Sequence, residues 1–280
     1  TSFINKFPDK YIDVGIAEEH AVTYAAGLAA AGFKPIVPIY STFMQRAYDH
    51  IFHDALLQKL PIIFCMDRSG VVGPDGPTHH GVFDISFMRS LPGMIVTAPK
   101  NGNELYDLLA TALDSEKIFS IRYPKDSSYK YDMKRNPKIL EIGKWELINK
   151  GTDTAVLAVG SMVSIIMDAK QYIYKSLGFL PTIVNARFIK PLDEKLLLNL
   201  SESHPNIMTL EEGALSGGFG SAVSEFLHDN NLNNKLIRLG VPDKFIQHGT
   251  RNELLDEVGL SVDNMINKIK IKELNPVYDI

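Results

Sequence analysis

Short apolar runs alternate with helix-length segments along most of the chain, and this alternation constrains the fold more than any other feature. The runs "KPIVPIY", "PIIFCM" and "IFSIRYP" have the length and the residue types of buried strands, and helical segments separate them. After a polar stretch the alternation resumes with "TAVLAVG", "PTIVNARF", "NIMTLEE" and "KLIRLGV". Repeated strand–helix units favour parallel sheets with helices on both faces. We therefore predict an α/β fold with two domains, each a mainly parallel sheet flanked by helices.

A change in composition marks the boundary between the predicted domains. Residues 125–138 read "KDSSYKYDMKRNPK", which is polar, and residues 139–151 read "ILEIGKWELINKG", which is compatible with a hairpin. We place a first domain at residues 1–124, a linker with a possible hairpin at 125–150, and a second domain at 151–280.

Two adjacent carboxylates stand at the first strand–helix junction, "YIDVGIAEEHAVTYAAG". "YIDVGI" is predicted as a buried parallel strand, and "AVTYAAGLAAAG" as a helix whose small side chains let another backbone or a second subunit approach closely. Glu18 and Glu19 lie between them. One interpretation is that both are surface residues that match the helix dipole. The other is that one carboxylate points into a crevice at the edge of the sheet, where α/β proteins bind ligands.

The loop "DRSGVVGPDGPTHHG", residues 67–81, is too long for a plain connection and is rich in Gly and Pro. It presents Asp75, His79 and His80 directly after a predicted parallel strand, where functional groups often lie. A structural turn with solvent-facing histidines is the alternative. Metal ligation is disfavoured, because no matching cluster of Cys or carboxylates accompanies the histidines.

Three arginines and two aromatic residues lie near the ends of predicted strands. Arg68 opens the loop, Arg122 ends the strand in "IFSIRYP", and Arg46 lies on the helix after "IYSTF". The arginine fork suits phosphate or carboxylate, although a lone arginine is more often in a surface salt bridge. Tyr40 and Phe43 are placed to stack on a heteroaromatic ring, or to form part of the core.

Composition narrows the class of protein. The formal net charge of −4 over 280 residues gives no support for a nucleic-acid surface or a basic membrane patch. We see no apolar run of membrane-spanning length and no signal peptide, so we expect a soluble intracellular protein. Cys65, the single cysteine, lies in the apolar run "PIIFCMD" and is predicted to be a reduced core thiol. The chain opens without an initiator Met, and we expect a fragment or a processed subunit.

A second glycine-rich segment, "LSGGFGSAV", precedes a predicted helix. Glycines before a helix N-terminus are typical of phosphate-binding loops. The segment matches neither the P-loop pattern nor the dinucleotide fingerprint, and close packing of helix on strand explains its glycines equally well.

Taken together, several strings closely resemble the 1-deoxy-D-xylulose-5-phosphate synthase family of the transketolase superfamily, whose enzymes use thiamine diphosphate. The most specific are "DVGIAEEHAVTYAAGLA", "KPIVPIYSTFMQRAYDHIFHD" and "DRSGVVGPDGPTHHGVFD". In the second domain, "ARFIKPLDE", "TLEEGALSGGFGSAV" and "LGVPDKFIQHGT" resemble the superfamily's C-terminal domain. The resemblance implies a pyrimidine-binding domain at 1–124 and a transketolase C-terminal domain at 151–280.

The resemblance also implies a role for individual residues. Glu18 matches the carboxylate that hydrogen-bonds the pyrimidine ring of the cofactor, and Phe43 matches the aromatic residue that stacks on that ring. The implied catalytic residues are Glu18, His79 and Asp75, and the implied cofactor-binding residues are Glu18, Phe43 and Arg46. The implied substrate-binding residues are Tyr40, Arg68, His79 and Arg122. Glu19 and His80 receive no role.

The implied reaction joins pyruvate to glyceraldehyde 3-phosphate with loss of CO2, giving 1-deoxy-D-xylulose 5-phosphate, the entry to non-mevalonate isoprenoid, thiamine and pyridoxal synthesis. The implied cofactors are thiamine diphosphate and Mg²⁺. In the family a preceding domain with a "GDG" motif holds the metal and the diphosphate, and this sequence has no such motif. No metal ligand is therefore assigned here, and the chain alone is expected to be inactive.

The implied partners are the chain's own N-terminal domain or a separate diphosphate-binding chain, together with a second copy in a homodimer. The implied location is the cytoplasm of a bacterium, or a plastid if the source is eukaryotic. Two related hypotheses stay open. In one, this chain is the second chain of a split transketolase; in the other, it is the β-subunit of a 2-oxo-acid dehydrogenase. A non-catalytic dimerisation module is the alternative of a different class.

Overall fold

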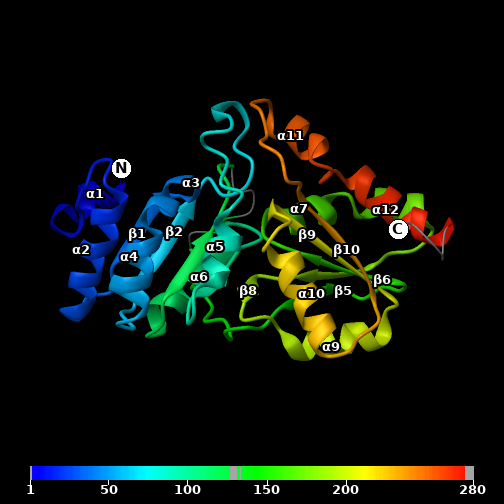
Figure 1. Cartoon of the computed structure of the whole chain (residues 1–280), viewed down its shortest axis with the longest axis horizontal. Helices are drawn as coiled ribbons and strands as arrows, with labels where there is room; N and C mark the ends of the chain where they lie inside the picture. Colours follow the sequence, from blue (N-terminus) through cyan, green and yellow to red (C-terminus); the bar gives the residue numbers. More distant parts are fainter. Residues whose placement is uncertain (1, 127–130, 133, 275–280) are drawn as a thin grey trace.

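A computed structural model describes residues 2–126, 131–132 and 134–274 and contains two five-stranded sheets side by side (Figure 1). The first sheet has the order β1-β2-β4-β3-β8. Its strands are β1 (Ile36–Tyr40), β2 (Ile63–Asp67), β4 (Phe119–Arg122), β3 (Ile95–Thr97) and β8 (Phe188–Lys190). The first four are parallel, and β8 is antiparallel to β3.

The second sheet has the order β10-β9-β6-β7-β5. Its strands are β10 (Lys235–Val241), β9 (Asn206–Ala214), β6 (Thr154–Ala158), β7 (Thr182–Asn185) and β5 (Glu146–Asn149). All pairs are parallel except β5 with β7. The predicted fold class, two mainly parallel sheets flanked by helices, is therefore confirmed.

Helices flank both sheets (Figure 1). Around the first sheet they are α1 (Ser2–Lys6), η1 (Pro8–Lys10), α2 (Glu18–Ala30), α3 (Ser41–Met44), η2 (Gln45–Ala47), α4 (Tyr48–His50), η3 (Ile51–Leu56), η4 (Gly73–Asp75), α5 (Asp84–Ser90) and α6 (Gly102–Asp114). Around the second they are α7 (Ser161–Asp168), α8 (Lys170–Leu177), α9 (Glu194–Ser203), α10 (Phe219–Asp229), α11 (Arg251–Glu257) and α12 (Val262–Leu274).

Local sequence accounts for several helix starts. The Asn101 side chain accepts a hydrogen bond from the Glu104 amide at the start of α6. Thr250 and Glu253 form a reciprocal capping box at the start of α11. Each cap satisfies amides that the first helical turn leaves without an intrahelical partner.

Two local predictions are wrong, and a third is correct in type but not in regularity. Residues 11–16 form no strand; they are largely exposed, and the Ile16 side chain is 91% exposed. The helix predicted for residues 43–59 is present but irregular: α, 3-10 and π-helical turns follow one another without a break through α3, η2, α4 and η3. Residues 139–151 contain one strand, β5, which pairs with β7 and so does not form the possible hairpin.

The two sheets are joined by more than a linker. The run predicted as one strand, residues 181–188, divides: β7 stays in the second sheet, while β8 extends the first. The buried Trp145 side chain donates to the Phe188 carbonyl over 2.7 Å. Part of the predicted linker, residues 127–130 and 133, lies outside the described residues, as do residues 1 and 275–280 of the predicted domains.

Candidate functional site

The carboxyl ends of three neighbouring strands bring candidate residues to one edge of the first sheet. In the register of the sheet, Tyr40 at the end of β1 pairs with Asp67 at the end of β2. Met66 of β2 pairs with Arg122 at the end of β4. The α3 turn and the residue 67–81 loop begin directly after β1 and β2, so their side chains are placed together by the parallel sheet.

Glu18 lies in the first turn of α2 with only 8% of the residue exposed. The Arg46 Nη1 atom donates to the Glu18 Oε1 atom over 3.0 Å. The Arg46 guanidinium carbon also lies over the Phe43 ring, 4.7 Å from its centroid. The carboxylate and the Phe43 ring therefore both contact the same planar cation. Glu19, the neighbouring acid, is less buried than Glu18.

An aromatic and cationic cluster continues from Phe43. The Tyr40 and Phe43 rings stack with centroids 5.6 Å apart and planes 17° apart. The Arg68 guanidinium carbon lies 3.7 Å from the Tyr40 centroid. Arg68 has a left-handed backbone, with φ at 58°, and its amide donates to the Asp67 carboxylate over 2.7 Å. A non-glycine residue in this region is strained, so the hydrogen bond helps to hold the turn that aims Arg68 at Tyr40.

His79 closes the cluster from the loop side. Its ring meets the edge of the Phe43 ring, with centroids 5.4 Å apart and planes 68° apart. Its Nδ1 atom lies 2.9 Å from the Thr78 hydroxyl. Contacts with aromatic rings thus connect four candidate residues, in the order His79, Phe43, Tyr40 and Arg68. Glu18 is connected to Phe43 through Arg46.

Asp75 lies farther along the same loop, in the turn η4. The Lys125 ammonium donates to its carboxylate over 2.6 Å. This hydrogen bond, and the positive charge of Lys125, lower the pKa of Asp75 below its usual value. Sequence reasoning missed Lys125. Its position three residues after the end of β4, at the sheet edge that carries the other candidates, was the available signal.

Arg122 and His80 take other positions. Arg122 is 5% exposed; its Nε donates to Asp84 and its Nη2 donates to the Glu212 carbonyl, both over 2.9 Å. Two of the three guanidinium nitrogens are thus engaged inside the protein, and the proposed contact of Arg122 with substrate rests on the third. His80 is buried and hydrogen-bonded at both ring nitrogens.

The second glycine-rich segment does not form an open phosphate cradle. The amides of Phe219 and Gly220, at the start of α10, donate to the buried Glu211 carboxylate over 2.6 and 2.7 Å. A phosphate would have to displace this carboxylate. Burial raises the pKa of Glu211 to about 7.

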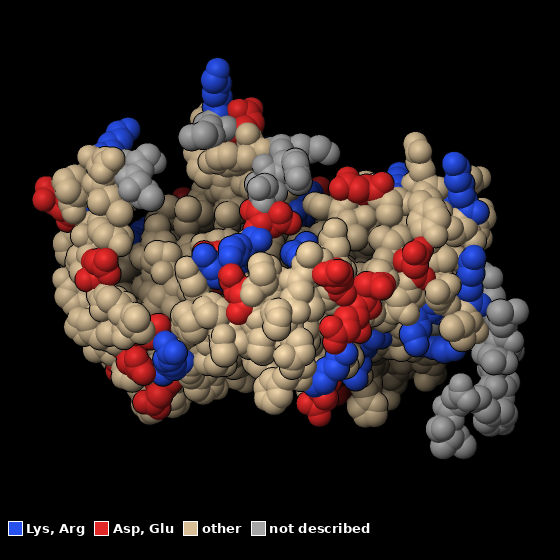
Figure 2. Space-filling view, turned by 90° about the horizontal axis from the view of Figure 1, so that it is seen from above, with Lys and Arg blue, Asp and Glu red and all other residues tan. Residues whose placement is uncertain are grey.

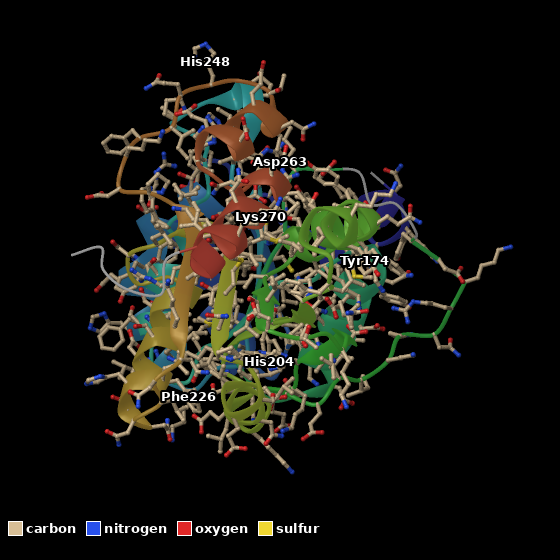
Figure 3. The ribbon with its side chains drawn as sticks, turned by 90° about the vertical axis from the view of Figure 1, so that its right-hand side faces the viewer. Tyr174, His204, Phe226, His248, Asp263 and Lys270 are labelled. Carbon is tan, nitrogen blue, oxygen red and sulfur yellow. The ribbon has the colours of Figure 1, made fainter. Side chains whose placement is uncertain are left out.

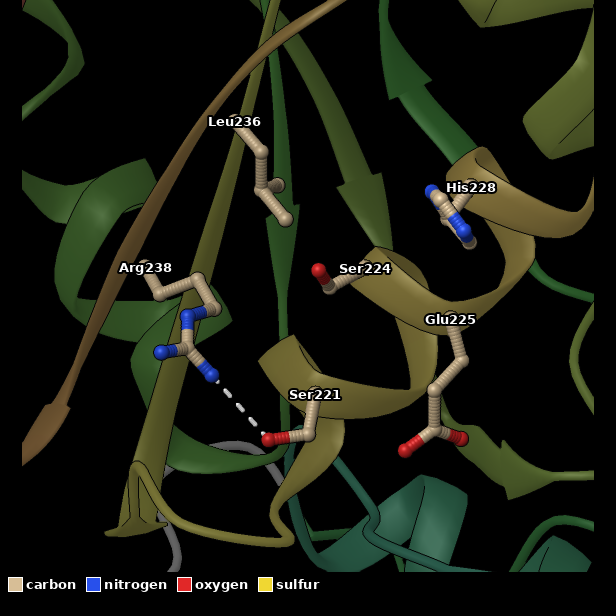
Figure 4. A pocket seen from close by; sticks show the side chains of 6 residues that line it. All are labelled: Ser221, Ser224, Glu225, His228, Leu236 and Arg238. Atoms are coloured by element: carbon tan, nitrogen blue, oxygen red, sulfur yellow. Dashed lines mark hydrogen bonds between the residues drawn. The ribbon is translucent and has the colours of Figure 1, made fainter. Parts of the chain in front are cut away.

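A separate pocket of about 490 Å³ lies beside α10 and β10 and shares no residue with the candidate cluster (Figure 4). In it the Arg238 guanidinium donates to the Ser221 hydroxyl over 3.0 Å, so its cation already has a partner. Cys65 is buried, and burial raises the pKa of its thiol to about 12, as expected of a core thiol.

Within the described residues, no group of three or more His, Cys, Asp or Glu side chains is arranged to hold a metal ion. No helix among those residues is long and apolar enough to cross a membrane. Acidic and basic side chains are interspersed on the face seen from above in Figure 2.

Comparison with known proteins places this arrangement in a family. Residues 2–130 match the pyrimidine-binding domain of transketolase, and residues 143–265 match the transketolase C-terminal domain. The chain belongs to the transketolase family. This transketolase-family chain is 49% identical over 267 residues to the 1-deoxy-D-xylulose-5-phosphate synthase of Dictyoglomus thermophilum, and 47% identical over 268 residues to that of Aquifex aeolicus. These matches cover 95% and 96% of the chain, but 43% and 42% of those relatives, so the chain spans about two fifths of their length.

Solved structures of the transketolase family share the fold. One, described as a split gene transketolase and an inactive beta4 tetramer, superposes with a TM-score of 0.83 at 25% identity and covers 96% of this chain and 85% of that one. Transketolase from Campylobacter jejuni superposes with a TM-score of 0.70 at 20% identity, covering 93% of this chain and 39% of that one.

Proposed function

We propose that the whole protein condenses pyruvate with glyceraldehyde 3-phosphate, with loss of CO2, to give 1-deoxy-D-xylulose 5-phosphate. The observation that carries this proposal is the 47–49% identity to synthases of that name over almost the whole chain. The gathered cluster of Glu18, Phe43 and His79 supports it, because these are the residues to which the resemblance gives roles in cofactor and substrate binding.

The residues present fit the pyrimidine end of thiamine diphosphate. Glu18 is a carboxylate largely removed from water, and Phe43 offers an aromatic ring close to it. When bound, the cofactor supplies the nucleophilic carbon and the electron sink that decarboxylation of a 2-oxo acid requires. Glu18 would hold a proton at a pyrimidine ring nitrogen, and Arg46 would compensate its charge during that exchange. Mg²⁺ and the diphosphate would be held by a diphosphate-binding region outside this chain.

The remaining cluster divides between the two ends of the phosphorylated aldehyde. Arg68 and Tyr40 would bind the phosphate, since an arginine fork suits that group. His79 would contact substrate hydroxyls and move protons, and Asp75, kept ionised by Lys125, would accept hydrogen bonds. Arg122 would add its third nitrogen to the phosphate site.

A homodimer is part of the proposal. Ile12, Ile16 and Tyr24 expose apolar surface at and before α2, and a partner surface would cover it. We place the protein in the bacterial cytoplasm, or in a plastid if the source is eukaryotic.

The other candidate function is that of the second chain of a split transketolase. The specific observation in its favour is the split gene transketolase structure, of which this chain covers 85%.

One assay separates these functions. The protein, supplied with its diphosphate-binding region, thiamine diphosphate and Mg²⁺, is given pyruvate labelled at the carboxyl carbon. The proposal predicts labelled CO2 release that depends on glyceraldehyde 3-phosphate, and a five-carbon deoxy sugar phosphate as product. Two-carbon ketol transfer between sugar phosphates, with no CO2 released, would instead identify a transketolase.

A further inference from the structure

The loop that carries Asp75 and His79 lies against the second domain over much of its length. Figure 1 shows it rising beside the segment that precedes α11. A Cβ atom built on Gly73 would lie 3.3 Å from the Gly249 carbonyl oxygen, and one built on Gly76 would lie 3.3 Å from the His248 Cβ. Van der Waals contact alone, however, does not fix the orientation of a glycine-rich loop.

His80 supplies a directional link between the loop and the second domain. It is 4% exposed, and its Nδ1 atom accepts a hydrogen bond from the Val72 amide over 3.1 Å. Nδ1 therefore carries no proton, so in the neutral ring Nε2 carries it. Nε2 then donates to the Gln247 carbonyl, 3.1 Å away. One ring thus joins the two arms of the loop and ties both to Gln247 of the second domain.

The base of the loop gives His80 little freedom. The amides and carbonyls of Gly70 and Gly81 exchange two hydrogen bonds of 2.8 Å. A Cβ atom on Gly81 would lie 2.4 Å from the Ser41 hydroxyl, so the chain directly after His80 is closely confined. The Val71 amide donates to the Glu212 carboxylate over 2.9 Å, which anchors the other arm to the second domain.

His79 is the residue whose place depends on this anchor. It precedes His80 directly, and its ring meets the edge of Phe43 while its Nδ1 atom meets the Thr78 hydroxyl. These contacts are all within the first domain, whereas the His80 ring reaches the second. The consecutive side chains of His79 and His80 therefore contact different domains. When the His80 ring is held, the peptide between the two residues is held as well, and this peptide orients the His79 ring.

We propose that His80 is a positioning residue that holds the residue 70–81 loop against the second domain and so sets the position of His79. The proposal rests on the proposed function, because it acts through a residue that function assigns to substrate. It gives the second domain a part in the reaction without any contact of that domain with substrate.

The test uses the whole protein and two substitutions. His80→Phe keeps a planar ring and removes both hydrogen bonds; His80→Gln keeps one acceptor and one donor. His204→Phe is the matched control, since His204 is also buried and hydrogen-bonded, to Thr182 over 2.8 Å. Figure 3 shows His204 low on the molecule, away from His248 beside the loop.

The first readout needs no activity. For His80→Phe we expect amide hydrogen exchange across residues 70–81 to rise about tenfold or more, and for His204→Phe we expect no change there. Unchanged exchange in the loop of the His80→Phe protein would overturn the proposal. If this variant does not fold, His80→Asn, which keeps an acceptor near Nδ1 and loses the donor to Gln247, takes its place with the same expected change.

The second readout is a double-mutant cycle with His79→Ala. We expect His80→Phe to lower kcat/KM for glyceraldehyde 3-phosphate roughly 10- to 100-fold, with partial recovery in His80→Gln. In the His79→Ala background the same change should cost less than about threefold, because the residue it positions is gone. An equal loss in both backgrounds would mark a purely structural role and refute the proposal. Lack of activity in the unmodified protein would refute the proposed function. The hydrogen-exchange measurement would still show whether His80 anchors the loop.

Discussion

Glu211 and Glu212 are adjacent buried carboxylates at the end of β9 with opposite surroundings. Glu212 accepts hydrogen bonds from the Val71 amide, the Ser161 hydroxyl and the Arg251 guanidinium, so its charge is paired. Glu211 accepts hydrogen bonds from two backbone amides of α10, and the positive charges of Arg122 and Arg238 act on it as well. Burial disfavours the charged form more than the amide hydrogen bonds and the two cations favour it, which is why the pKa of Glu211 rises to about 7.

This shift predicts a pH dependence of stability. Folding raises the pKa of Glu211 from 4.5 to about 7, so the folded protein binds the proton more tightly than the unfolded chain. The stabilising contribution is complete below pH 4.5 and is lost as pH rises through 7, by about 3 kcal/mol in total. We expect the stability of the wild type, relative to Glu211→Gln, to fall between pH 5 and pH 8. Urea unfolding at both pH values measures it; parallel pH profiles for the two proteins would contradict the assigned shift.

Among the elements, α2 and the residue 67–81 loop show how differently two glycines are used. Gly27 lies within α2, and a Cβ atom there would meet no atom within 4 Å. Gly70 has φ at 83°, and a Cβ atom there would lie 2.5 Å from the Glu212 carboxyl group. Gly27 lowers the stability of the helix, and no packing contact inside this chain requires a glycine there. Gly70 leaves room for the Glu212 side chain, which links the two domains.

Alanine at each position tests this contrast. Gly27→Ala should stabilise the chain by about 0.5–1 kcal/mol, because alanine has the higher helix propensity. Gly70→Ala should destabilise it by about 2–4 kcal/mol through backbone strain and overlap with Glu212. Urea midpoints at constant m-value give both numbers. Equal effects of the two substitutions would show that the loop yields more easily than its packing indicates.

Sequence patterns predicted most elements, because strand and helix periodicity is a local property. These predictions failed where the structure of a segment depends on residues that are distant in the sequence. Residues 11–16 are apolar enough for a strand, yet none of the strands in the described residues pairs with them. Residues 181–188 are predicted as one strand, but only β7 lies in the second sheet, whereas β8 pairs with β3 in the first sheet.

The same limit applies to the candidate site. Strand ends and the Gly/Pro loop indicated Tyr40, Arg68 and His79 because a parallel sheet gathers its carboxyl ends at one edge. Nothing in the sequence around Arg122 or His80 reveals that their partners, Asp84, Glu212 and Gln247, come from elsewhere in the fold.

At the scale of the whole molecule, the two sheets form one structure through the short connection between β7 and β8 and through buried polar contacts. Arg187, between β7 and β8, donates to Glu104 of α6 over 3.1 Å and to the Lys144 carbonyl over 3.0 Å. Arg122 and Glu212 join the sheets at their carboxyl edges. The candidate cluster lies at that edge, so its geometry depends on both domains.

The most direct test compares Glu18→Gln with Glu19→Gln in the whole protein, measured as CO2 release from pyruvate that depends on glyceraldehyde 3-phosphate. Glutamine keeps the shape of either residue and removes the proton exchange that only the buried Glu18 is proposed to perform. We expect Glu18→Gln to lower kcat at least about 100-fold and Glu19→Gln to change it less than about twofold. A Glu18→Gln protein that keeps a third or more of the wild-type kcat would contradict the account.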